Sequence, residues 1–267
     1  MSAAVSYERV REQLQQLKME AALTALDPVL EQAQKAEKLS VEVLDELFGI
    51  ELATRFERRV KTNLKLSGLP RPKTLEEFDF DAQPQVPRDT VDELATLRFL
   101  HHGENVLLLG PCGVGKTHLA TGLALKAIEH GHRVYFLTLH DLVTRSRARR
   151  DKNRLDSLMR VLIRPQILIL DEVGYLPLEQ PDATFLFEVV NKRYQAQKSI
   201  ILTSNKSFGQ WDEIFPDPVL AIALLDRLLH HATTLNIRGE SYRLRHRRRA
   251  GLTTPPPQPE PETTMSP

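Results

Sequence analysis

The stretch from Gly110 to Thr117, GPCGVGKT, constrains the fold more than any other feature of the chain. It follows the apolar run NVLLL and precedes ATGLALKAIEH, a helix-like segment, so it is expected to join a buried strand to a helix. Glycines let backbone N–H groups turn toward phosphate oxygens, and the helix N-terminus adds partial positive charge. The sequence therefore predicts a phosphate-binding loop. Its predicted nucleotide contacts are Gly110, Pro111, Cys112, Gly113, Val114, Gly115, Lys116, Thr117 and His118.

Acidic and amide side chains follow two later apolar runs. ILILDE ends in Asp171 and Glu172, and SIILTSN ends in Asn205. We expect Thr117 and Asp171 to hold Mg²⁺, with Lys116 reaching the β- and γ-phosphates. In this interpretation Glu172 polarises the attacking water and Asn205 orients it. The acidic pair favours hydrolysis of ATP over binding alone.

Five apolar runs alternate with helical segments from about Lys73 onward. They are residues 105–110, 133–139, 166–172, 199–205 and 233–237. Four of them are nearly continuous in Val, Ile and Leu, as is typical of strands buried on both faces of a parallel sheet. The pattern predicts an α/β fold with a five-stranded parallel sheet.

The first 70 residues have the spacing of helices. Val10, Leu14, Leu17 and Ala21 predict one apolar stripe, and Asp27-Pro28 is expected to break that helix. A second helical stretch, rich in Leu, Phe and Arg, ends at SGLPRP. We therefore expect an N-terminal helical module over residues 1–70, an ATPase domain over 71–250 and a disordered Pro-rich tail over 251–267.

The net charge is only +1, but the basic residues are clustered. RLRHRRR, residues 243–249, is one basic stretch. The other lies on a predicted helix between the second and third strands, where two basic rows suit the spacing of DNA phosphates better than a small ligand. Neither stretch interleaves aromatic residues, so backbone contact with duplex DNA is expected. The predicted DNA contacts are Arg145, Arg147, Arg149, Arg150, Lys152 and Arg154.

Composition and hydropathy indicate the cellular compartment in which the chain is expected. No apolar run approaches the roughly 20 residues of a membrane span, and the first residues lack a signal-peptide core. The single cysteine, Cys112, excludes an intrachain disulfide framework and a cysteine-based zinc site. These observations predict a protein of the cytoplasm.

The order GPCGVGKT, ILILDE, LTSN and LLDRLLHHA resembles that of AAA+ ATPases of the initiator and helicase-loader group. Within that group the chain is most similar to the IstB-like helper ATPases that accompany insertion-sequence transposases. The resemblance covers residues 5–249, including TLEEFDF and GESYRLR. It implies an AAA+ P-loop core in a bacterial protein. Since few residues follow TTLNI, the C-terminal lid is expected to be reduced or absent and a lid-borne second sensor is not expected, although Arg243 could supply a charge nearby.

The resemblance also implies partners. Arg227 stands where such proteins carry an arginine finger, which implies a homo-oligomer with ATP sites between subunits. The leading hypothesis is an ATP-dependent protein that oligomerises on duplex DNA, remodels or selects the target, and recruits a separately encoded transposase. The alternatives are a replicative helicase loader acting on single-stranded DNA, and a small-molecule kinase. The kinase hypothesis leaves the basic helix unexplained.

Overall fold

The computed structural model describes residues 3–71, 73–152 and 154–242. The chain divides into two compact units, Met1–Leu66 and a second unit that begins at Ser67. The basic stretch at 243–249, with Arg243, and the Pro-rich tail at 251–267 lie outside the described residues. Among the helices of the described part, none is long and apolar enough to cross a membrane.

A five-stranded parallel sheet forms the centre of the second unit, with strand order β2-β3-β4-β1-β5. This confirms the predicted fold class. The strands are β1 (Asn105–Leu109), β2 (Val134–Thr138), β3 (Ile167–Val173), β4 (Ser199–Ser204) and β5 (Ala232–Asn236).

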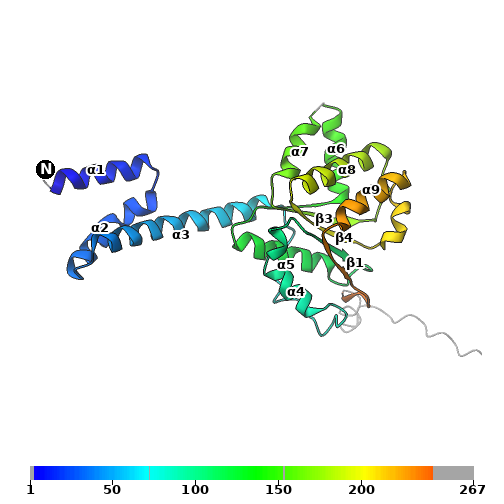
Figure 1. The fold of residues 1–267 in the computed structure, drawn as a ribbon, viewed down its shortest axis with the longest axis horizontal. Coiled ribbons are helices and arrows are strands. Elements are labelled where there is room, and N and C mark those ends of the chain that lie inside the picture. Colours follow the sequence, from blue (N-terminus) through cyan, green and yellow to red (C-terminus); the bar gives the residue numbers. More distant parts are fainter. Residues whose placement is uncertain (1–2, 72, 153, 243–267) are drawn as a thin grey trace, which may run out of the picture. The chain divides into compact units, whose positions relative to one another are not determined.

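Helices cover both faces of this sheet (Figure 1). Leu107, Leu168 and Leu202 pack in one core with the helices on one face, whereas Val106 and Ile169 alternate with them and are also fully buried. Because both faces are buried, both sets of alternating positions are apolar, which explains the continuous apolar runs. The first face carries α6 (Leu139–Arg150), α7 (Leu155–Ile163), α8 (Gln180–Gln195) and α9 (Pro218–Leu229); the second carries α4 (Arg88–Ala95) and α5 (Lys116–Glu129). Short 3₁₀ helices span Arg98–Leu100 and Phe208–Glu213.

The parallel arrangement brings the carboxyl ends of all strands to one edge of the sheet. The phosphate loop follows β1, Asp171 and Glu172 lie near the end of β3, and Asn205 follows β4. The described residues end at Tyr242, six residues after β5, so the expected reduced or absent lid stays a prediction.

The N-terminal unit consists of α1 (Ala3–Gln16), α2 (Glu20–Lys35) and α3 (Ser40–Leu66). Leu14, Leu26, Val29 and Leu47 form its core. The predicted break at Asp27-Pro28 is wrong, because Pro28 lies inside α2. The helix instead ends before Lys18, whose φ of 54° is left-handed, and Leu17 of the predicted stripe is exposed.

A carboxylate from α3 explains where α2 begins. Oε2 of Glu51 accepts hydrogen bonds from the backbone N–H groups of Ala21 and Ala22 at 2.9 and 3.0 Å. Burial would raise the pKa of Glu51, but these bonds and one from Arg55 lower it overall, so the cap is ionised. Capping of the first turn and burial of α2 offset the hydrogen bond that Pro28 cannot donate.

Candidate nucleotide-binding site

Glycines shape the loop between β1 and α5. Gly113 and Gly115 have φ values of 81° and 100°, which side chains other than glycine rarely adopt. A Cβ at Gly110 would lie 2.0 Å from the carbonyl oxygen of Ile237, and one at Gly115 would lie 2.6 Å from the ring of Phe78. The loop is therefore held closely between its neighbours, and it leads directly into the N-terminus of α5, where backbone N–H groups favour an anion.

Lys116 is buried at the first position of α5. Its Nζ donates to the carbonyl oxygens of Gly110 and Pro111, at 2.6 and 2.7 Å. Burial lowers the pKa of Lys116, while Cys112, Asp171 and Glu172 act in the opposite direction. Because the described hydrogen-bond partners are neutral carbonyls, the ammonium group is suited to phosphate oxygens.

Asp171 lies beside the start of α5. Its Oδ1 and Oδ2 accept from the Thr117 hydroxyl at 3.0 and 3.1 Å, and Oδ1 also accepts from the Thr203 hydroxyl at 2.5 Å. A carboxylate and a hydroxyl are hard oxygen ligands of the kind that Mg²⁺ prefers. The residues present therefore fit the predicted metal site next to the phosphate loop.

Glu172 has an exposed side chain and a left-handed backbone with a φ of 61°. The register of β3 against β4 shifts here, between Leu170 and Val173, and the Glu172 N–H donates to Thr203 Oγ1 at 3.0 Å. At this irregularity Glu172 lines the cavity next to the phosphate loop, whereas its neighbour Asp171 is buried. Strained backbone of this kind is concentrated at functional sites.

Asn205 follows β4 at the same edge of the sheet. Its Oδ1 is buried and has no hydrogen-bond partner among the described residues. A Cβ at Gly174 would lie 2.8 Å from this oxygen, so Asn205 packs against the loop that follows Glu172. The amide therefore lies beside the residue that comes two positions after Glu172, and its role in orienting water stays a prediction.

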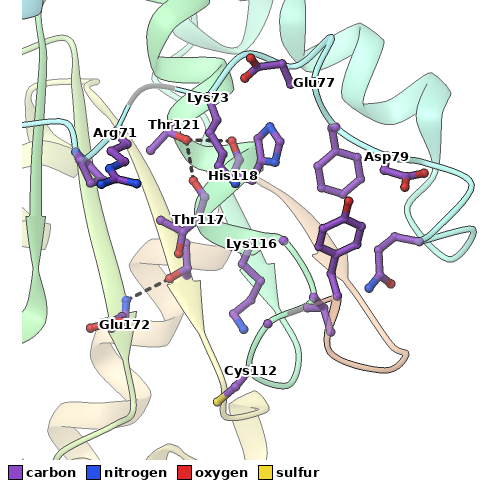
Figure 2. A pocket seen from close by; sticks show the side chains of 18 of the residues that line it. Arg71, Lys73, Glu77, Asp79, Cys112, Lys116, Thr117, His118, Thr121 and Glu172 are labelled. Carbon is purple, nitrogen blue, oxygen red and sulfur yellow. Dashed lines mark hydrogen bonds between the residues drawn. The ribbon is translucent and has the colours of Figure 1, made fainter. Parts of the chain in front are cut away.

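A cavity of about 450 Å³ extends from the phosphate loop. Residues from the segment before β1, including Arg71, Lys73 and Phe78, border it together with Tyr242 (Figure 2). His118 was predicted to contact nucleotide; its Nε2 lies 2.7 Å from the Thr74 carbonyl, and its ring meets Phe78 edge-on. His118 thus connects the segment before β1 to α5. Burial lowers the pKa of His118.

Arg227 lies at the opposite edge of the sheet. Asn105 at the start of β1 donates from Nδ2 to the Leu228 carbonyl at 3.0 Å, which places the end of α9 there. The five residues of β1, roughly 17 Å of strand, separate this edge from the phosphate loop. Arg227 therefore lies at the edge of the sheet that is remote from the ATP site of its own chain.

Neutral groups hold the Arg227 guanidinium. Nε donates to Asn191 Oδ1 and Nη1 to the Ala223 carbonyl, each at 2.8 Å, and the group lies over the Phe187 ring, 4.8 Å from its centroid. Arg227 forms no ion pair with any carboxylate of the described residues, Asp226 included. A cation oriented without a counter-ion is suited to receive an anion.

The predicted basic helix is interrupted. α6 ends at Arg150 and α7 begins at Leu155, so Lys152 and Arg154 lie in the turn between two helices and the continuous basic rows are wrong. Arg147 and Arg150 pair with the buried Asp182, and Arg145 donates to the Tyr135 hydroxyl. Arg149, Lys152 and Arg154 form no ion pair with the described residues. These three are the basic side chains at the α6–α7 corner, the turn between the two helices, that are left without an acidic partner among the described residues.

The family model described as IstB-like ATP binding protein matches residues 12–250. The chain belongs to this family. It is 49% identical over 241 residues to a Pseudomonas aeruginosa protein named for ATP binding in insertion sequence IS21, covering 90% of this chain and 91% of that one. A Geobacillus stearothermophilus protein named for insertion sequence IS5376 is 44% identical, covering 90% and 96% of the two chains.

Solved structures agree with the fold of this IstB-like chain. A DnaC helicase loader has a TM-score of 0.51 and 21% identity, covering 66% of this chain and 99% of that one. DnaA from Aquifex aeolicus bound to AMPPCP has a TM-score of 0.56 and 20% identity, covering 70% and 58%. The likeness establishes an AAA+ P-loop NTPase fold.

Sequence reasoning missed several residues of this IstB-like site. Thr203 is hydrogen-bonded to both Asp171 and Glu172, and Phe78 and Tyr242 line the cavity. The hydroxyl of Thr203 lies two residues before Asn205 in SIILTSN, but its role depends on β4 lying next to β3, which the sequence alone does not reveal. Tyr175 was also missed; its hydroxyl lies 3.0 Å from Cys112 Sγ.

Proposed function

We propose that the protein is an ATP-hydrolysing helper of an insertion-sequence transposase. It oligomerises on duplex DNA in the bacterial cytoplasm, remodels or selects target DNA, and recruits or activates a separately encoded transposase. Hydrolysis of ATP controls its release. The relatives named for insertion sequences support the biological setting.

The observation that carries the ATPase assignment is the joint placement of Lys116, Thr117, Asp171 and Glu172. Lys116 would bind the β- and γ-phosphates, and Thr117 with Asp171 would hold Mg²⁺. The bound metal ion would neutralise charge on the phosphate oxygens. Glu172 accepts a proton from the attacking water, since its exposed carboxylate lines the same cavity as Lys116, and Asn205 orients that water.

Arg227 completes the site of a neighbouring copy in this proposal. Its guanidinium lies a strand length from its own phosphate loop and has only neutral partners in the described chain. A bidentate donor of this kind stabilises the charge that develops on the transferred phosphoryl group. The ATP site is then formed by two subunits, and turnover requires assembly.

The test is ATP hydrolysis together with equilibrium binding to duplex and single-stranded oligonucleotides of equal length, each with ATP, ADP and no nucleotide. We expect ATP-dependent preference for duplex DNA and loss of nucleotide binding in Lys116→Ala. Preference for single strands would favour the helicase-loader alternative. Unchanged ATP affinity in Lys116→Ala would defeat the nucleotide-site assignment.

A further inference from the structure

The outer side of α3 carries an apolar row that no other described part of the N-terminal unit covers. Leu47 and Ile50 on one side of α3 pack on α1 and α2. On the opposite side Phe48, Leu52 and Phe56 are 47%, 67% and 38% exposed. A helix that is apolar on two opposite sides has a second surface to bury.

The row is symmetric about Leu52. Phe48 and Phe56 lie four residues before and after it, and Asp45 and Arg59 lie seven residues before and after it. Steps of three and four residues keep all five positions on one side of a helix. If two copies of α3 pair antiparallel across a two-fold axis at Leu52, each Phe48 meets the other copy's Phe56, and each Asp45 meets an Arg59.

The charges at the ends of the row suit such a pairing. Asp45 and Arg59 are both exposed, and neither forms an ion pair with the described residues, whereas their neighbours Glu46 and Arg58 pair within the unit. Arg59 instead lies over the ring of Phe56, 5.0 Å from its centroid. An opposite charge at the matching position of a second copy would pair with each of them.

Gly49 gives an independent indication. It lies in the middle of α3, where glycine costs backbone entropy, and a Cβ there would meet nothing within 4 Å. The described chain therefore supplies no packing reason for a glycine at this position. Close approach of a second helix beside the apolar row would supply one.

We propose that the outer row of α3 is an isologous interface, at which a second copy of this chain docks antiparallel with Leu52 on the two-fold axis. This interface is distinct from the head-to-tail contact that joins Arg227 to a neighbour's ATP site. Together the two interfaces link the protein into pairs through α3 and into larger assemblies through the ATPase units.

Charge exchange tests the register. Sedimentation equilibrium of the full, nucleotide-free chain should show that Asp45→Arg and Arg59→Asp each weaken dimerisation about tenfold or more, since like charges then face each other. The double variant should return to within about threefold of the parent, because both pairs are restored with reversed sign. Glu57→Arg, on the same helix but outside the row, should have no such effect. A monomeric parent, or a double variant no tighter than the singles, overturns the proposal.

Crosslinking tests the axis. In a Cys112→Ser background, Leu52→Cys should form a disulfide-linked dimer under mild oxidation, because the two-fold axis brings identical positions together. Glu57→Cys is the matched exposed control and should remain monomeric. Equal crosslinking of the two variants, or none at position 52, contradicts docking of a second copy and would point to another partner for the row.

Discussion

At the scale of single residues, Thr203 joins the two acidic positions of the site. Its hydroxyl donates to the Asp171 carboxylate and accepts from the Glu172 N–H, so it ties the Asp171 side chain to the backbone at Glu172. The Thr203→Val substitution keeps the shape of the side chain but removes both hydrogen bonds of the hydroxyl. We expect a fall in kcat of about 10- to 100-fold with ATP still bound, as for other residues that orient metal ligands. Single-turnover kinetics and ATP titration measure the two quantities.

Thr203→Ser is the matched control, because it keeps the hydroxyl and loses only the methyl group. It should recover most of the parent activity. If Thr203→Val and Thr203→Ser were equally slow, packing at this buried position rather than the hydrogen bonds would be responsible.

Asn191 is a neutral hydrogen-bond partner that leaves the positive charge of Arg227 uncompensated. It accepts from Arg227 Nε, and an aspartate there would accept equally well but would neutralise the guanidinium. We predict that Asn191→Asp leaves folding and ATP affinity unchanged while lowering kcat by about tenfold or more, as expected for an arginine that stabilises phosphoryl charge. A purely structural contact would tolerate the aspartate. Parent-like kcat in Asn191→Asp would therefore contradict the role of Arg227.

At the scale of elements, the five strands could be predicted within one or two residues. Four of them, β1 to β4, are largely buried on both faces, so their apolar runs are nearly continuous, whereas β5 at the sheet edge is only partly buried. The start of α2 could not be predicted, since its cap, Glu51, comes from about 30 residues further along the chain. The interruption after α6 also depends on contacts between distant segments. Arg147 and Arg150 pair with the buried Asp182 of α8, which the sequence alone does not reveal.

The basic residues of α6 and the following turn thus differ in their partners: Arg147 and Arg150 pair with Asp182, Arg145 bonds to the Tyr135 hydroxyl, and the other three form no ion pair with the described residues. Arg149, Lys152 and Arg154 are the group left for DNA. Replacing all three with Ala should weaken duplex binding and reduce the slope of log K against log salt by up to about 0.9 for each phosphate that is no longer neutralised. Fluorescence anisotropy at several salt concentrations measures this slope.

The double variant Arg147→Ala/Arg150→Ala is the comparison for this triple variant. It leaves the buried Asp182 carboxylate without its ion pairs, so we expect a loss of stability, visible as a lower midpoint of urea unfolding. An unchanged salt slope in the triple variant would remove this corner as the DNA contact. Parent-like stability in the double variant would contradict the structural role of the two arginines.

At the scale of the whole molecule, the ATP site and Arg227 lie at opposite edges of one sheet. A contact between these two surfaces is head-to-tail, so each copy offers one surface to each of two neighbours. Tyr194 and His231 line the same cavity as Arg227, so the surface next to the guanidinium is concave. A neighbouring copy's phosphate loop would meet this edge.

Mixing two inactive variants tests this arrangement. Glu172→Gln keeps Arg227 but lacks the base, and Arg227→Ala keeps the base but lacks the guanidinium, so each alone should bind ATP and turn it over slowly. In an equal mixture about a quarter of the interfaces pair an intact base with an intact arginine, which should restore about a quarter of the parent turnover. Arg227→Ala mixed with Lys116→Ala should recover in the same way. Steady-state ATPase assays against mixing ratio measure the recovery, and a mixture no more active than its components would mean that Arg227 does not act on a neighbouring site.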